Sequence, residues 1–220
     1  MTGKIISFGN KIPRPLASPG RRVLWLLILF CPFPAAADTF TFKADHMSGG
    51  RASGKEITVL SGNAELRSDK ILLKADRIEI QGDDSQFVDC SGEVWGREEE
   101  KDILFRTERL RYDRKLKILR MEGNSTLEDR QNELVARGRF IEYDDQAEIT
   151  VFQISVRLFK NDMVCRSEYA VYRRPEKLLD LSGFPVVYKK DDEFRADRIR
   201  VDLDTEDVTM EGKVSGSIKN

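Results

Sequence analysis

The chain has 220 residues, of which 40% are hydrophobic and 34% are charged, with 15 Gly and 7 Pro. This composition excludes an intrinsically disordered protein, because the chain has enough apolar residues to bury a core. Lys and Arg (37) nearly balance Asp and Glu (38), and a chain without a basic excess is a poor candidate for nucleic-acid binding.

The N-terminus has the order of a secretory signal peptide. Residues 1–37 contain five basic residues and no acidic one, then the apolar run Val23–Phe30, then Ala35-Ala36-Ala37 before Asp38. We predict cleavage after Ala37. The apolar run falls short of the roughly 20 residues that span a bilayer, so a retained membrane anchor is the less favoured alternative. Cleavage leaves 37 − 5 = 32 basic against 38 acidic residues, a net charge of −6 for one exported domain, residues 38–220.

A pattern recurs about every thirty residues through this domain. The tetrapeptide Ala-Asp-Arg-Ile occurs at Ala75–Ile78 and again at Ala196–Ile199. Aligning the third residue of the tetrapeptide gives an anchor series of six positions: His46, Arg77, Arg109, Arg139, Glu168 and Arg198. A period of this size indicates stacked structural repeats.

Each unit alternates apolar and polar residues, which predicts two strands with one buried face. The positions four before and one after the anchor are apolar in all six units, and their odd spacing predicts a bulge at the Ala-Asp-Arg step. A glycine follows in the second strand, except that Gln153 takes its place in the fourth unit, and we expect the sheet to bend there. Glu142 is a second departure, at an otherwise apolar position. The sequence thus predicts an all-β, folded-over antiparallel sheet of about six two-strand units with an unprotected last strand.

The inward columns are the candidate functional residues. Periodicity alone leaves open whether they form a closed core or line a slot for acyl chains, each methylene of which contributes about 0.8 kcal/mol when buried. The candidate lipid-binding residues are Leu60, Ile78, Cys90, Leu110, Met121, Phe140, Val151, Tyr169, Leu181, Ile199 and Met210.

No catalytic or metal-binding constellation is evident, and we expect no cofactor. His46 is the single histidine, so no relay or zinc site can be built around a second one. Cys90 and Cys165 lie between two and three repeats apart, beyond the roughly 7 Å reach of a disulfide, so we predict free, buried thiols.

The anchor column of arginines, next to acidic neighbours, has two interpretations. A ladder of exposed ion pairs is favoured over a track for the phosphates of an anionic glycolipid. The arginines concerned are Arg77, Arg109, Arg139 and Arg198.

Several features resemble the LptA/OstA-like lipopolysaccharide-transport family. They are the leader, the six units, the step from an alanine to an apolar residue three positions later, as in Ala75–Ile78 and Ala196–Ile199, and the apolar-x-Gly-x-apolar step, as in Cys90–Val94 and Met210–Val214. The resemblance covers residues 38–220. It implies a periplasmic β-jellyroll, with no enzymatic activity, that shields the acyl chains of lipopolysaccharide or a related glycolipid. It also implies contacts through the terminal strands with related jellyroll domains of the inner- and outer-membrane complexes, and head-to-tail self-association.

Three alternatives remain at this point. One is the membrane-anchored, LptC-like component of the same bridge, which a retained leader would distinguish. Another is a ligand-free structural β-solenoid with a dry core, which bound lipid would contradict. An exported hydrolase is the last, and nothing beyond His46 supports it.

Overall fold

The computed structural model describes residues 40–52, 55–68 and 70–219. All described residues lie in the second of the two units into which the chain divides, Ala37–Asn220. The predicted signal peptide and its cleavage site after Ala37 lie outside the described residues, so both stay predictions. Nothing in the described ranges is a helix long and apolar enough to cross a membrane.

The described part of the second unit consists almost entirely of strands, with one 3-10 turn at Asp83–Ser85. The strands in chain order are β1 (Thr41–Lys43), β2 (His46–Ala52), β3 (Lys55–Arg67), β4 (Ile71–Gln81), β5 (Phe87–Glu98), β6 (Ile103–Asp113), β7 (Ile118–Asp129), β8 (Leu134–Asp144), β9 (Ile149–Lys160), β10 (Met163–Arg173), β11 (Leu178–Ser182), β12 (Val186–Lys189), β13 (Asp192–Arg195), β14 (Arg198–Asp202), β15 (Val208–Glu211) and β16 (Ser215–Ser217). The all-β prediction is therefore confirmed.

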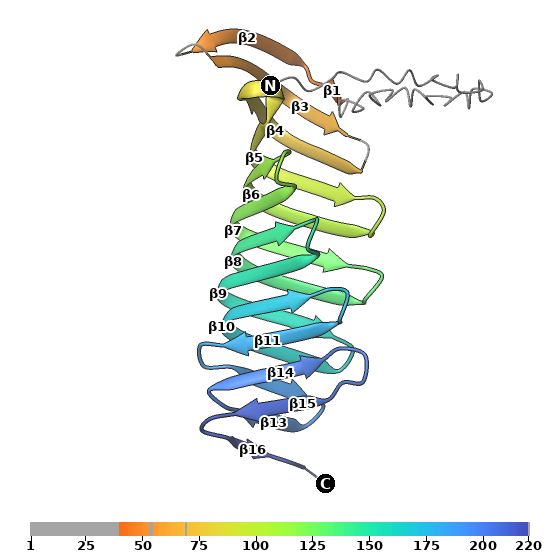
Figure 1. Ribbon diagram of the computed structural model, residues 1–220, viewed down its shortest axis with the longest axis vertical. Helices are drawn as coiled ribbons and strands as arrows, with labels where there is room; N and C mark the ends of the chain where they lie inside the picture. The colour runs from red at the N-terminus through yellow and green to blue at the C-terminus, as the bar shows by residue number, and fades with distance from the viewer. Residues whose placement is uncertain (1–39, 53–54, 69, 220) are drawn as a thin grey trace, which may run out of the picture. The chain divides into compact units, whose positions relative to one another are not determined.

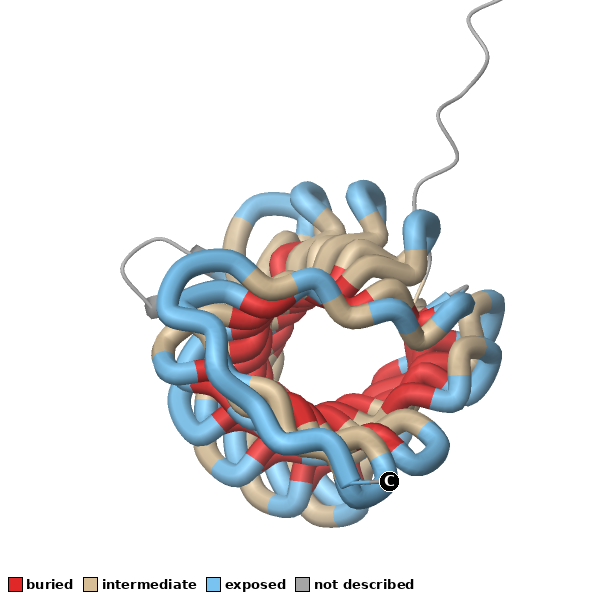
Figure 2. The backbone as a smooth tube through the Cα atoms, turned by 90° about the horizontal axis from the view of Figure 1, so that it is seen from below, coloured by how far each residue is buried: buried red, intermediate tan, exposed pale blue. Residues whose placement is uncertain are grey.

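The strands form one antiparallel sheet in which sequence neighbours pair from β3 to β11 (Figure 1). Each long strand bends near its middle, so the sheet folds into two facing arms. The first arm contains β1, β12, β13 and β16 together with one half of each long strand. These halves are the C-terminal ones of β3, β5, β7 and β9 and the N-terminal ones of β4, β6, β8 and β10. The second arm contains β2, β11, β14, β15 and the other halves. Viewed along the stack, the backbone traces a closed outline with its buried residues turned inward (Figure 2).

The inner faces of the two arms meet in one continuous hydrophobic core. Phe105 and Leu127 come from the first arm, and Leu119 and Met121 come from the second; each is at most 1% exposed. The strands alternate buried and exposed residues along both arms, as one-sided burial of a sheet requires. The folded-over sheet around an apolar interior, predicted from the period-two pattern, is the observed architecture.

A bulge separates the arms in each long strand pair, as predicted. In the β4–β5 pair the register shifts between Lys74 and Arg77, which is the Ala-Asp-Arg step. The residue opposite each bulge has a positive φ: Gly62, Gly92, Gly123, Ile154, Gly183 and Gly212. We call these positions the corners. Glycine suits a corner because it has no Cβ to clash at positive φ.

The register of the fourth and fifth units differs from the sequence alignment by one residue. Phe140 pairs with Glu122, which pairs with Arg109, so Phe140 and not Arg139 is the structural equivalent of Arg109. A one-residue shift turns each side chain to the opposite face of the sheet. The predicted inward positions Phe140, Val151 and Tyr169 are therefore wrong. The inward residues are Ile141, Phe152 and Ala170, each 0% exposed.

The same correction removes one of the two predicted departures of the fourth unit and moves the other by one residue. Glu142 lies on the outer face and pairs with Arg120 (Oε2–Nε 2.6 Å), while Tyr143 takes the inward position and is 1% exposed. Gln153 pairs with Phe140 on the outer face. The residue that replaces the corner glycine is Ile154, with φ of 66°.

Candidate lipid-binding interior

The interior is filled by its own side chains. Of the eleven candidate lipid-binding residues, seven are at most 3% exposed: Leu60, Ile78, Cys90, Leu110, Met121, Leu181 and Ile199. Met210 is partly buried and packs against the same core. Phe140, Val151 and Tyr169 lie outside it, and Tyr169 is 40% exposed. A ligand could enter between the arms only if the arms moved apart.

The candidate set omitted one whole wall of the interior. The middle of the first arm contributes large buried side chains, among them Leu66, Leu73, Phe105, Leu127 and Leu158. A second column on the second arm contains Tyr112, Tyr143 and Tyr172, at most 3% exposed. The period-two pattern contained the signal for both, because each member lies two residues from another inward position.

An acidic side chain packs against the glycine at five of the six corners. A Cβ placed on Gly92 would lie 2.3 Å from Asp76 Oδ2, so glycine is required for space as well as for its φ. Glu108 accepts a hydrogen bond from the backbone N–H of Asn124, the residue after Gly123 (3.1 Å). The acidic residue of the Ala-Asp-Arg step therefore holds the bend and satisfies a backbone donor that the bulge leaves unpaired.

The fourth corner lacks both partners of this arrangement. Arg139 stands where the other units have an acid, and Ile154 stands where they have glycine. A β-branched residue at positive φ is a strained conformation, and the Ile154 side chain is 51% exposed. Burial therefore does not offset the strain. The backbone N–H of the next residue, Ser155, donates instead to Glu168 of the following strand (3.1 Å).

A polar seam closes the interior where the free ends of the two arms meet. Asp129, at the end of the first arm, is 0% exposed. It accepts hydrogen bonds from two residues at the end of the second arm, Tyr172 Oη (3.1 Å) and Arg174 Nε (2.9 Å). These groups form a buried, charge-assisted link between the arms.

A second link crosses the seam nearby. Lys101 Nζ, in the turn after β5, lies 2.5 Å from Asp145 Oδ1 in the turn after β8, and it also donates to Tyr143 Oη at 3.3 Å. The Lys101 and Asp145 side chains are 17% and 12% exposed. Because solvent screens such pairs less than surface pairs, this contact and the Asp129 contact hold the arms together at their open side.

Glu98 lies beside this seam and is 1% exposed. Its Oε2 accepts the Lys101 backbone N–H at 2.5 Å, while Oε1 has no partner among the described residues. Burial raises the pKa of the Glu98 carboxyl, and the Lys101 N–H opposes that rise. The seam therefore contains one carboxyl whose charged form the fold disfavours.

The remaining expectations concern cysteines and metals. Cys90 and Cys165 are free and buried, as predicted. Burial raises the pKa of each thiol to about 12, so neither is a reactive thiolate. Within the described ranges no group of His, Cys, Asp and Glu is arranged to hold a metal ion.

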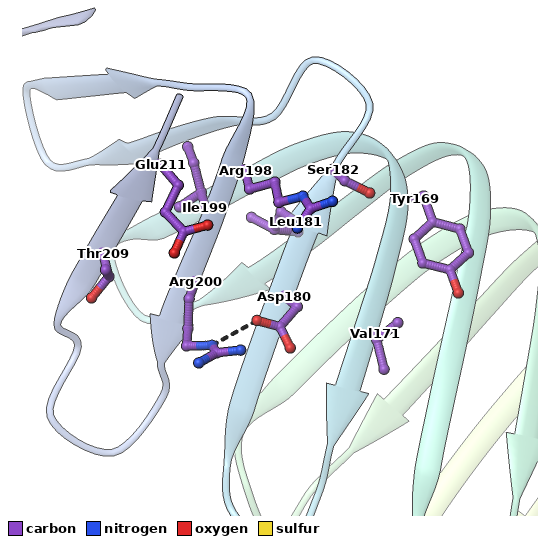
Figure 3. A pocket seen from close by; sticks show the side chains of 10 residues that line it. All are labelled: Tyr169, Val171, Asp180, Leu181, Ser182, Arg198, Ile199, Arg200, Thr209 and Glu211. Atoms are coloured by element: carbon purple, nitrogen blue, oxygen red, sulfur yellow. Dashed lines mark hydrogen bonds and ion pairs between the residues drawn. The ribbon is translucent and has the colours of Figure 1, made fainter. Parts of the chain in front are cut away.

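The outer face of the second arm shows the favoured ion-pair interpretation at two of the four anchor arginines. Arg77 pairs with Glu79 and Arg109 with Glu122, both at 3.1 Å. Arg198 lies opposite Glu211 in the sheet. The side chains labelled in Figure 3 line a hollow on this face, where Arg200 Nε reaches Asp180 Oδ1 (2.7 Å). The volume of the hollow is about 350 Å³. Arg77, Arg109 and Arg200 are thus neutralised by neighbouring carboxylates.

Comparisons with known proteins agree with this architecture. Residues 42–149 match the family described as LptA/(LptD N-terminal domain) LPS transport protein. No match was found among curated proteins. A crystal structure of LptH, the LptA-homologous periplasmic component of the lipopolysaccharide transport device of Pseudomonas aeruginosa, aligns over 83% of this chain and 96% of its own, with 9% identity and a TM-score of 0.26. That score is too low to add to the argument, which rests on the family match and on the folded-over repeat sheet. By this match, residues 42–149 of the chain belong to the LptA-like family of lipopolysaccharide transport proteins.

Proposed function

We propose that this protein is a non-enzymatic periplasmic carrier that shields the acyl chains of lipopolysaccharide, or of a related glycolipid, between its two arms. The observation that carries the proposal is the continuous apolar inner face, which runs from β3 to β14 and has polar contacts along the side where the free ends of the arms meet. Such contacts can exchange with water when the seam opens, whereas the covalent bend at the corners cannot separate. We infer that acyl chains enter through the seam.

The terminal strands support end-to-end assembly with related domains. Among the described strands, β2 pairs only with β3, β15 only with β14, and β16 only with β13, so each end of this sheet presents an edge that can accept another strand. Exposed apolar side chains accompany these edges: Met47 (59%) at one end, Val214 (54%) and Ile218 (71%) at the other. A head-to-tail contact between such edges does not close on itself and can extend into a bridge.

Photocrosslinking in cells tests the proposal directly. A photoreactive residue at Leu110 or Met121 faces the interior, and one at Arg111 or Tyr169 faces outward, as matched controls on the same sheet. We expect glycolipid adducts at the inward positions only. Adducts at the outward positions alone, or none in cells that contain the lipid, would contradict transport in the interior.

The structural, ligand-free solenoid is a second candidate, and one observation favours it: the inner residues are already fully packed without ligand. The same crosslinking experiment separates the two candidates, because a permanently closed core gives only intramolecular products at Leu110 and Met121. The LptC-like alternative differs in the leader, and N-terminal sequencing of the exported protein decides it.

A further inference from the structure

Four exposed arginines form a row on the outer face of the first arm. Arg137 of β8 lies directly opposite Arg157 of β9, which lies opposite Arg166 of β10. Arg106 of β6 continues the row, with Thr126 of β7 between it and Arg137. Since neighbouring strands lie about 4.8 Å apart, the row runs for roughly 20 Å along the stack.

The four guanidinium groups have no carboxylate partner. None of them makes an ion pair or a side-chain hydrogen bond within residues 40–52, 55–68 and 70–219. Arg137 lies over the Phe159 ring (5.5 Å to the centroid) and Arg166 over the Tyr188 ring (5.3 Å), so aromatic rings hold two of them in place. Like charges directly opposite one another destabilise a sheet. The row therefore costs the isolated fold stability and contributes no ion pair in return.

The row begins at a hollow on the same face. Trp95 lies opposite Arg106 in the sheet, and both line a hollow of about 480 Å³ together with Glu93, Glu108 and Asn124. An indole ring can pack on the C–H face of a sugar, and the neighbouring carboxylate and amide groups can bond its hydroxyls. The face thus combines an indole ring, with polar groups beside it, and a row of arginines without carboxylate partners among the described residues.

We propose that the outer face of the first arm binds a phosphorylated saccharide, with Trp95 packed on a sugar ring and the arginines holding phosphates. Arginine binds phosphate oxygens in a two-pronged geometry. The domain carries a net charge of −6 after leader removal, as calculated above, so an anionic ligand is repelled elsewhere and directed to this face. That the saccharide is the head group of the transported glycolipid rests on the proposed function, whereas phosphate recognition by the row does not.

Equilibrium binding of a deacylated oligosaccharide to residues 38–220 tests this site. The probe is the lipopolysaccharide oligosaccharide with its acyl chains removed and its phosphates retained, compared with the same oligosaccharide after phosphatase treatment. Without acyl chains the probe cannot report on the interior. We expect the phosphorylated probe to bind at least about tenfold more tightly than the dephosphorylated one, with affinity that falls as salt rises.

The triple variant Arg137→Gln, Arg157→Gln, Arg166→Gln should lose at least about tenfold in affinity. The matched control is Arg77→Gln, Arg111→Gln, Arg200→Gln, which removes the same charge from the second arm and should leave affinity within about twofold. Circular dichroism melts check that both variants fold. Equal losses in the two variants would overturn the site, and so would binding that ignores the phosphates.

Two further arms identify the source of the phosphate. If intact glycolipid competes with the probe, the row binds the head group of the transported lipid. If only the free oligosaccharide competes, the site is restricted to soluble saccharides. Arginine-dependent binding to phosphatidylglycerol vesicles without binding of the oligosaccharide would overturn the proposal in favour of a membrane surface. If Leu110 gives no lipid adduct while the oligosaccharide still binds, the proposed carrier function fails and the phosphate site stands.

Discussion

The two arms are halves of the same strands, yet their outer faces differ in how the charged side chains are paired. On the outer face of the second arm, arginines alternate with carboxylates, as in the Arg111–Asp89 and Arg120–Glu142 pairs. On the outer face of the first arm, Arg106, Arg137 and Arg157 have no such partners among the residues that the structure describes. Both inner faces are apolar. The inner faces and the seam hold the fold together, whereas the outer face of the first arm carries a row of cations that the proposed ligand would neutralise.

The largest expected effect comes from breaking the seam between the arms. Asp129→Asn removes the buried carboxylate of the Asp129–Arg174 pair and leaves Arg174 with Glu148 (3.0 Å) as its remaining counter-charge, so the loss should lie at the lower end for a buried pair, about 3 kcal/mol of unfolding free energy. Urea denaturation measures the change. Arg200→Gln, on the exposed pair of the second arm, is the control and should change the unfolding free energy far less, because solvent screens that pair. Equal costs for the two variants would mean that the seam does not hold the arms.

The next effect concerns packing inside the first arm. A Cβ on Gly96 would lie 2.0 Å from the Phe105 ring, and Phe105 is 1% exposed. Gly96→Ala should therefore cost about 1–3 kcal/mol through overpacking. Gly50→Ala, in β2 of the second arm, is the control because nothing lies within 4 Å of the added carbon. A neutral Gly96→Ala in the same denaturation assay would show that the interior is already loose.

A smaller effect, of opposite sign, is expected at the fourth corner, where the two arms join. Ile154→Gly should stabilise the protein by about 1 kcal/mol, because glycine adopts the positive φ without strain. Gly92→Ile is the reciprocal change and should destabilise, since its Cβ would meet Asp76. Melting temperatures of the two variants provide the comparison. If Ile154→Gly lowered stability, contacts of the exposed isoleucine would outweigh its backbone strain.

The smallest effect is a pH dependence at the end of the first arm. Burial raises the pKa of Glu98 in the folded state above its unfolded value, so the folded protein binds more protons between the two values. The stability that the protonated Glu98 carboxyl contributes is fully present below its unfolded-state pKa and is lost as pH rises through its folded-state pKa. Relative to Glu98→Gln, the wild type should lose unfolding free energy as pH rises above the ordinary range of a glutamate carboxyl. Parallel curves for the two proteins would contradict this assignment.

Much of the fold could be predicted from the sequence, because one-sided burial leaves a period-two pattern and each bend needs a bulge and a glycine. The register of two units could not, since aligning Arg139 with Arg109 favoured chemical identity over the structural equivalent, Phe140. That single residue reversed the faces of Phe140, Val151 and Tyr169.

The seam and the arginine row were missed for a different reason. Lys101 and Asp145 are 44 residues apart and Asp129 and Arg174 are 45 apart, separations that a repeat of about thirty residues does not connect. The arginine row depends on which residues face each other across strands. Only the register shows that Arg137, Arg157 and Arg166 are consecutive and that no carboxylate lies between them.

The central claim is that the closed interior opens at the seam to admit acyl chains, and a spin-label distance across the seam tests it most directly. Labels at Arg130, at the end of the first arm, and Gln146, at the end of the second, occupy exposed turn positions. Cys90 and Cys165 are buried and should not react with the label. We predict that lipopolysaccharide lengthens this distance, whereas the deacylated oligosaccharide leaves it unchanged. An unchanged distance with lipid shown to be bound would contradict opening at the seam.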